Sequence, residues 1–293
     1  GKTKVLYAKG CEIKGASTEH IDDAIGVAKE SDVAIVVVGE SIEMSAEAAC
    51  RACLDLPGVQ EELVKAIHGT GVPVVEVLMN GRPLSISWSM EHVPAILEAW
   101  FPGVQAGNAI ADVIMGNCNP GGRLPVTFPR TVGQVPIYYN HKNTGRPPSP
   151  DKWTSKYLDV PFTPLLPFGY GLSYTRFEYS NLRIDPEKIA PGEQVTISLD
   201  VENIGDCKGD EVVQLYLRDV VASVTRPVKE LKGFKRITLE RGEKKAVGFA
   251  LAREELSLVN RDLKRVVEPG TFKVMVGKSS EDIQLTGNFE IVE

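Results

Sequence analysis

The stretch Ala34-Ile35-Val36-Val37-Val38-Gly39-Glu40 decides the fold of the first half of the chain. Its continuous, largely β-branched apolar run is typical of a strand that is buried on both faces of a parallel sheet. Similar runs at residues 74–79 and 95–100 are further candidates for central strands. Because amphipathic segments alternate with these runs, the sequence predicts an α/β domain in which helices flank a mostly parallel sheet.

Two helices are predicted from apolar residues at helical spacing. The first covers residues 59–67, follows Pro57, which is favoured in a first helical turn, and ends at His68-Gly69-Thr70-Gly71. The second covers residues 105–115 and ends at Gly116-Asn117. Both are expected to cover the sheet.

Beyond Tyr174 the helical period disappears, and short strands recur at the spacing of a β-sandwich. Strands are predicted at residues 177–184, 194–203, 211–219, 228–238, 244–251, 270–277 and 284–292. This pattern predicts an all-β sandwich of the immunoglobulin or fibronectin type III kind. The chain is therefore divided into an α/β domain at 1–137, an inter-domain linker at 138–173 and the sandwich at 174–293.

Composition excludes several classes of function. The net charge of −6 over 293 residues gives no basic footprint for nucleic acid, and no apolar run approaches the ~20 residues of a membrane helix. Five scattered cysteines make no disulfide framework. Cys50-Arg51-Ala52-Cys53 has redox-motif spacing, but no second pair completes a metal site, so the redox state of Cys50 and Cys53 stays open.

Chemistry is expected just after the first strand, because ligands of open α/β sheets bind beyond the carboxyl ends of the strands. This segment carries Glu40, Glu43, Glu47 and Arg51 but lacks the Gly-rich turn of a phosphate or dinucleotide site. A carboxyl group near the apolar end of a sheet can have a raised pKa and act as the proton donor of glycoside hydrolysis. An acidic loop is also compatible with a plain solvated surface, so the residues alone leave both readings open.

Residues 39–60, GESIEMSAEAACRACLDLPGVQ, resemble the acid/base loop of glycoside hydrolase family 3. Later stretches are similar to the rest of that family's second domain and its lead into a sandwich: MNGRPLS, AILEAWFPGVQAGNAIADVIMGNCNPGGRLPVTFPR, VGQVPIYYNHKNTGRP and LLPFGYGLSYTRFEYS. The resemblance covers essentially the whole chain. It is strongest to periplasmic bacterial β-glucosidases with a C-terminal fibronectin type III-like domain.

The resemblance implies where catalysis would reside. In that family a (β/α)8 barrel, absent from this chain, provides the aspartate nucleophile and most sugar contacts, and a loop of the second domain provides the acid/base glutamate. Ser45-Ala46-Glu47, leading to Cys50-Arg51, best matches the family's acid/base segment. Glu47 is therefore the expected acid/base, with Glu40 as the alternative and Arg51 as the supporting residue that orients the loop carboxylates.

Departures from the family pattern lie beside the expected acid/base. Ala46 replaces a common Gly, and because Ala adopts a positive φ less readily, a different loop path is expected. Cys50 replaces a common Ser or Asp. Glu43 is expected in solvent, His68 is expected to be structural, and His141 is expected to lie in a stretch that packs against the barrel.

The expected function is that of the C-terminal part of a retaining, exo-acting β-glucosidase acting on β-glucosides or cello-oligosaccharides, without a cofactor or metal. Alternatives are a β-xylosidase or another exo-glycosidase of the family, and a non-catalytic scaffold or sugar-binding module whose sandwich supports a homodimer. The resemblance implies a periplasmic or secreted location, although the strand-like start of the chain contains no signal peptide. Without the barrel the chain is expected to be inactive, with an exposed sheet edge or apolar face that lowers its solubility.

Overall fold

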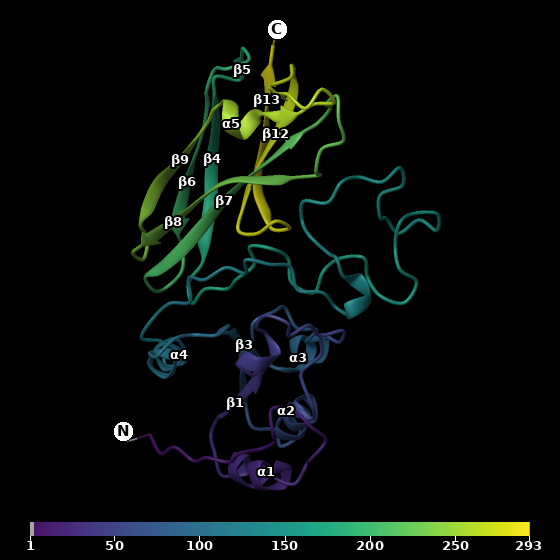
Figure 1. Cartoon of the computed structure of the whole chain (residues 1–293). Coiled ribbons are helices and arrows are strands. Elements are labelled where there is room, and N and C mark those ends of the chain that lie inside the picture. Colours follow the sequence, from purple (N-terminus) through teal and green to yellow (C-terminus); the bar gives the residue numbers. More distant parts are fainter. Residues whose placement is uncertain (1–2, 293) are drawn as a thin grey trace. The chain divides into compact units, whose positions relative to one another are not determined.

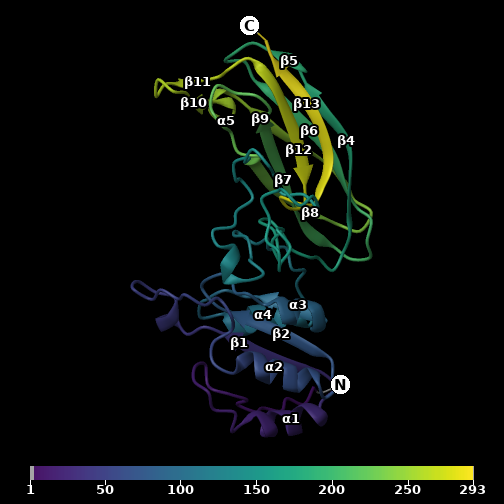
Figure 2. The ribbon, with the colours of Figure 1, turned by 90° about the vertical axis from the view of Figure 1, so that its right-hand side faces the viewer.

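The computed structural model describes residues 3–292 and shows two compact units. Unit 1 comprises the described residues up to Asp112 together with Phe128–Val135. Unit 2 comprises Val113–Thr127 together with the described residues from Pro136 onward. Figures 1 and 2 together label the α-helices and strands of the two units.

Unit 1 is an α/β domain. In chain order it contains α1 (Ile21–Lys29), β1 (Ala34–Gly39), the 3-10 helix η1 (Ile42–Met44), α2 (Gln60–His68), β2 (Val74–Met79), α3 (Ser87–His92), β3 (Ala95–Glu98), most of α4 (Ala106–Ile114) and the 3-10 helix η2 (Val132–Gln134). The strands form one parallel sheet in the order β1-β2-β3. Helix α2 packs on β1 and β2, and α1 packs on α2 (Figure 2). The predicted parallel sheet with flanking helices is confirmed.

The core of unit 1 is formed by apolar side chains of α2 and of the central strand β2. The apolar side chains of α2 recur at helical spacing, and Leu63, Val64 and Ile67 are buried. The central strand β2 is almost inaccessible, since Val77 and Leu78 are at most 1% exposed. Burial of these side chains against one another holds α2 on the sheet.

The prediction that the first strand is buried on both faces is wrong. Val36 and Val38 are buried, but Ile35 is 52% and Val37 is 56% exposed. Strand β1 lies at an edge of the sheet, and in the described part of the chain its second face is open to solvent. The exposed apolar face that the sequence led us to expect is therefore present.

Two other boundaries of unit 1 differ from the sequence prediction. The strand expected over residues 95–100 ends at Glu98. Trp100 adopts a left-handed conformation with φ of 54°, which is incompatible with an extended strand. The strand-like stretch at the start of the chain forms no strand in its described residues, 3–10.

Unit 2 is built around a β-sandwich. It contains β4 (Phe177–Asp185), β5 (Lys188–Ile189), β6 (Val195–Asn203), β7 (Gly209–Asp219), β8 (Glu230–Leu239), β9 (Lys244–Leu251), α5 (Arg253–Leu256), β10 (Leu258–Val259), β11 (Arg265–Val266), β12 (Gly270–Gly277) and β13 (Ile283–Ile291). One sheet has the order β5-β13-β12-β7-β8 and the other β4-β6-β9 (Figure 1). The predicted all-β sandwich is confirmed.

Alternation along the strands makes the sandwich core. Val195, Ile197, Leu199 and Val201 of β6 are buried at every second position, so one face of that strand lies in the core. Each strand predicted from the sequence has a counterpart: β4, β6, β7, β8, β9, β12 and β13. Strands β5, β10 and β11 were not predicted, because each is only two residues long.

Residues 140–173, all of them described, form no helix or strand. Within unit 2, Tyr139 stacks on Phe168 with ring centres 4.5 Å apart, whereas Trp153 is 72% exposed. The aromatic residues of this segment therefore divide between packing and solvent. No helix in the described residues has the length and apolar character needed to span a membrane.

Candidate active site: the loop after β1

The candidate loop begins where β1 leaves the sheet at Gly39. This residue has φ of 140°, and a Cβ atom there would collide with the backbone of Met79 on the neighbouring strand, so only glycine fits. The buried amide of Gln60, at the start of α2, accepts from the Gly39 N–H at 2.6 Å and donates to the Gly39 carbonyl at 2.8 Å. The loop therefore leaves the sheet from a fixed point.

Glu40 lies at this point, and its side chain is fully buried. Its Oε1 lies 2.7 Å from Nη1 of Arg51 and 3.0 Å from Nε of Arg82. The Gly81 N–H donates to Oε2 at 3.3 Å. These donors stabilise the charged carboxylate, and the paired geometry is the form in which a buried charge is tolerated.

Arg51 connects Glu40 to the end of the loop. Its second guanidinium nitrogen, Nη2, donates to the Asp55 carbonyl at 2.8 Å. The structure thus places Arg51 and Glu40, two residues that the sequence singled out, in direct contact. Arg51 contacts the buried carboxylate rather than that of Glu47.

Arg82 was not predicted from the sequence, yet it holds the loop most directly. Besides its contact with Glu40, its Nη2 donates to the Met44 carbonyl and, at 3.0 Å, to the Ala49 carbonyl. These two carbonyls flank Glu47 in the sequence. One guanidinium therefore fixes the backbone on both sides of the expected acid/base.

Glu47 itself projects into solvent. Its carboxylate has no hydrogen bond or ion pair with any residue between 3 and 292. The Ala49 N–H donates to the Ala46 carbonyl at 3.1 Å, which closes a tight turn around Glu47. Glu47 is thus a free carboxylate on a turn whose two ends are held.

The unusual backbone in this turn lies at Ala48, which has φ of 60°, and not at Ala46. Ala46 itself has no positive φ, and the different loop path expected from its replacement of glycine stays a prediction. An L-residue in the left-handed region costs roughly 1 kcal/mol relative to glycine. The turn keeps Ala48 in this conformation through its backbone hydrogen bond and the contacts of Arg82.

Other carboxylates of the region divide between surface and interior. Glu43 is exposed, with its Oε2 4.0 Å from Nζ of Lys14. Glu98, at the carboxyl end of β3, accepts from the Trp100 N–H at 3.0 Å and from the Asn80 amide at 3.3 Å. Burial nevertheless raises the pKa of Glu98 to about 7. Glu98 is a buried carboxyl at this sheet edge that the sequence pattern did not single out.

Glu76 is the second buried carboxyl of unit 1. It lies in the middle of β2, and burial raises its pKa to about 7, an effect that the Ser89 hydroxyl opposes only in part. Within residues 3–292, neither carboxyl oxygen reaches a partner with regular hydrogen-bond geometry. A neutral, protonated Glu76 therefore fits this position.

The histidine and the cysteines considered in the sequence analysis lie outside the group of side chains around Glu40. His68 forms edge contacts with the rings of Trp88 and His92, at 5.5 and 5.9 Å between ring centres. The cysteines Cys50 and Cys53 are exposed free thiols, and Cys53 lies 3.1 Å from an Asp55 carboxylate oxygen. Among the described residues no group of three or more His, Cys, Asp or Glu side chains could hold a metal ion.

The chain thus combines a parallel sheet that carries charged residues at its carboxyl edge with a β-sandwich that follows it in the sequence. The model of the glycosyl hydrolase family 3 C-terminal domain matches residues 3–174, and that of a fibronectin type III-like domain matches residues 211–280. The first match covers more than half of the chain. The chain belongs to glycoside hydrolase family 3, as the resemblance implied.

Two relatives extend the comparison. The chain is 52% identical over 278 residues to a "Beta-xylosidase" of Formosa agariphila, covering 95% of this chain and 38% of that protein. It is 45% identical over 312 residues to a "Periplasmic beta-glucosidase" of Salmonella typhimurium, covering 99% of this chain and 41% of that protein. The chain thus spans about two fifths of the length of these relatives.

A solved structure agrees with the fold. The β-glucosidase from Listeria innocua in complex with glucose superimposes with a TM-score of 0.93 at 42% identity, over 97% of this chain and 40% of that one. The two relatives are named as a β-xylosidase and a β-glucosidase and the structural neighbour as a β-glucosidase, which agrees with the family to which the chain belongs.

Proposed function

We propose that this chain supplies the acid/base loop of a retaining, exo-acting β-glucosidase, with Glu47 as the proton donor. The observation that supports this role is the contrast between a held backbone and a free carboxylate. Arg82 binds the carbonyls of Met44 and Ala49, while the Glu47 carboxylate forms no hydrogen bond or ion pair with a described residue. A general acid needs this combination, because its backbone must be positioned while its carboxyl group meets the substrate.

In the proposed reaction Glu47 acts in two steps. Its carboxyl group first gives a proton to the glycosidic oxygen while the bond from that oxygen to the anomeric carbon breaks and a nucleophilic carboxylate bonds to that carbon. The resulting Glu47 carboxylate then takes a proton from a water molecule, and the water oxygen displaces the nucleophile. The sugar leaves with its original anomeric configuration.

In this proposal, the (β/α)8 barrel of the family provides the nucleophile and most of the contacts with the sugar. A retaining mechanism places the two carboxyl groups ~5 to 5.5 Å apart. Glu47 is exposed and can face such a partner, whereas the Glu40 carboxylate is buried and bound by two guanidinium groups. We therefore favour Glu47 over Glu40 as the acid/base and assign Glu40 and Arg51 to holding the loop.

Glu47→Gln in the complete enzyme tests the assignment. For an aryl β-glucoside with a poor leaving group, kcat/KM should fall by about 10²- to 10⁴-fold, because proton donation is lost. A highly activated aryl glucoside needs no proton and should lose far less in the glycosylation step. Glu43→Gln, an exposed carboxylate of the same loop, is the matched control and should retain activity on both. Equal losses on both substrates for Glu47→Gln would reject its role as proton donor.

A β-xylosidase is the second candidate, favoured by the 52% identity to a protein of that name. The two activities differ in the sugar pocket, since xylose lacks the hydroxymethyl group of glucose. The ratio of kcat/KM for matched aryl glucosides and xylosides decides between them. A ratio below one would replace the glucosidase proposal by the xylosidase.

Other expectations complete the proposal. The Salmonella relative is named as periplasmic, and we propose a periplasmic or secreted location for this protein. The boundaries at residues 137 and 173 stay a prediction that limited proteolysis tests, with cleavage expected between them. A homodimer through the sandwich also stays a prediction, for which sedimentation velocity is the measurement.

A further inference from the structure

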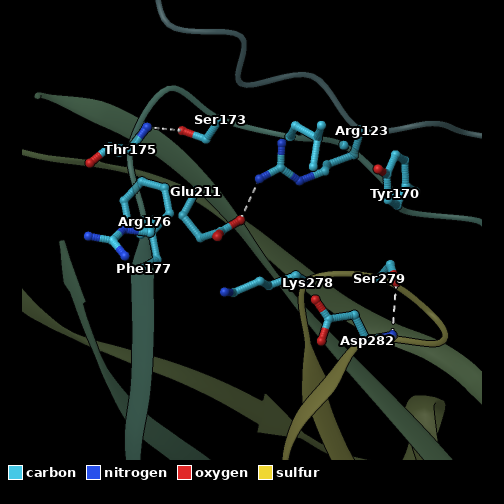
Figure 3. A pocket seen from close by; sticks show the side chains of 12 residues that line it. Arg123, Tyr170, Ser173, Thr175, Arg176, Phe177, Glu211, Lys278, Ser279 and Asp282 are labelled. Carbon is cyan, nitrogen blue, oxygen red and sulfur yellow. Dashed lines mark hydrogen bonds and ion pairs between the residues drawn. The ribbon is translucent and has the colours of Figure 1, made fainter. Parts of the chain in front are cut away.

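Unit 2 contains a pocket that the acid/base proposal does not use. Its volume is about 270 Å³, and its walls come from residue 123, the segment 170–177, β7 and the turn between β12 and β13. Figure 3 shows Arg123 and Tyr170 on one side of it and Lys278 and Asp282, from the β12–β13 turn, on another. One ordered water needs only ~10 to 15 Å³ of such volume, so the pocket has room for one small molecule.

The walls of this pocket are fixed before any ligand binds. Leu124 and Tyr170 are joined by a backbone hydrogen bond of 2.8 Å, and the Gly169 N–H donates to the Leu124 carbonyl, also at 2.8 Å. The buried amide of Gln214 donates to the Gly169 carbonyl at 3.0 Å and to the Lys278 carbonyl at 2.6 Å. One buried side chain therefore ties two opposite walls together, and such preorganisation lowers the entropy cost of binding.

A buried ion pair forms part of the lining. Nη2 of Arg123 lies 2.7 Å from Oε1 of Glu211, and the two side chains are only 7% and 2% exposed (Figure 3). The Glu211 carboxylate also accepts from the Val212 N–H at 2.7 Å. These contacts hold Arg123 and Glu211 in place away from bulk water. Because the local dielectric constant is low there, hydrogen bonds from these groups to a ligand are stronger than in water.

Several polar groups of the lining form no hydrogen bond or ion pair with the described residues. The Lys278 ammonium forms no ion pair within residues 3–292 and lies 5.8 Å from the centre of the Tyr179 ring. The Tyr170 hydroxyl and the Asp282 Oδ2 likewise have no hydrogen-bond partner in the described part of the chain. The pocket thus offers donors and an acceptor side by side, and the lining also includes the aromatic side chain of Tyr170.

This mixture identifies the ligand by its chemistry. The lining carries the cations Arg123, Arg176 and Lys278 as well as two carboxylates. Glu211 already pairs with Arg123, and the Asp282 carboxylate would repel a phosphate or sulfate ion, which disfavours such an ion here. A neutral polyol both donates and accepts hydrogen bonds, and its C–H face packs on aromatic rings. We propose that this pocket binds a neutral monosaccharide, at a site separate from the acid/base loop and independent of the role of Glu47.

Calorimetric titration of the 293-residue chain with glucose, xylose and inorganic phosphate tests the proposal. Saturable binding of a sugar is expected, with phosphate binding more weakly. Lys278→Met and Tyr170→Phe should each weaken sugar binding by about tenfold, because each removes a hydrogen-bond donor that has no other partner. Lys273→Met, an exposed lysine on β12, is the matched control and should leave the affinity unchanged.

Glu47→Gln separates this proposal from the proposed function, since it should leave sugar binding to the isolated chain unchanged whatever it does to catalysis. An unchanged unfolding midpoint confirms that Lys278→Met and Tyr170→Phe keep the fold. The proposal is overturned if no sugar binds saturably, if phosphate binds more tightly than sugar, or if the pocket variants bind sugar as well as Lys273→Met does.

Discussion

Glu76→Gln should remove a large part of the pH dependence of stability in unit 1. The carboxyl group of Glu76 lies in the middle of β2 with no regular hydrogen-bond partner, and burial raises its pKa from the reference value of 4.5 to about 7. Because the folded state holds this proton more tightly than the unfolded state, the stabilising contribution is fully present below about pH 4.5. It is lost progressively as the pH rises through about 7.

The size of the effect follows from the shift. A difference of about 2.5 pKa units at ~1.4 kcal/mol each corresponds to about 3 kcal/mol. The neutral amide of Gln avoids this cost at every pH. The free energy of unfolding of Glu76→Gln, minus that of the unsubstituted protein, should therefore increase by about 3 kcal/mol between about pH 4 and pH 9.

Urea unfolding followed by tryptophan fluorescence measures this difference. Trp153→Phe serves as the background, because the remaining tryptophans, Trp88 and Trp100, both lie in unit 1 and report on that unit alone. Glu62→Gln removes an exposed carboxylate on α2 and should change the difference by less than about 0.5 kcal/mol. A flat difference curve for Glu76→Gln would refute the assignment of a buried proton to this residue.

Three further outcomes follow from the loop and the open sheet face. Arg82→Met should lower kcat/KM of the complete enzyme by about 10²-fold through loss of loop positioning, while Lys14→Met near the same loop should not. Ala48→Gly should raise the free energy of unfolding by up to about 1 kcal/mol in chemical denaturation, because glycine adopts φ of 60° without strain. Replacing Ile35 and Val37 together by Thr should reduce self-association of the chain in light scattering, and unchanged association would show that this face is not responsible.

Local patterns were sufficient for much of the fold. The β-branched run at 34–38 identified β1, and alternation along residues 195–203 identified a sandwich strand, because period and burial go together in both. The same run could not reveal that β1 is an edge strand with one open face, since edge position depends on which strands pair. The partner of β1 is β2, whose residues lie about forty positions further along the chain.

In the candidate site, too, contacts between residues far apart in the sequence could not be predicted. The sequence indicated Arg51 as the residue that orients the loop carboxylates, and in the structure it binds the Glu40 carboxylate at 2.7 Å. Arg82 was missed because it reaches Glu40 across 42 residues of sequence, and no local signal marks the fold that brings them together. Glu98 was absorbed into an apolar strand pattern, although its burial is what raises its pKa to about 7.

The acid/base role of Glu47 is tested most directly by azide rescue of Glu47→Ala in the complete enzyme. With the carboxyl group removed, the glycosyl-enzyme intermediate formed from an activated aryl glucoside waits for a nucleophile that needs no general base. Azide should restore turnover and yield a glycosyl azide of retained β configuration. Absence of both rescue and the azide product, in a folded enzyme that still forms the intermediate, would contradict the account.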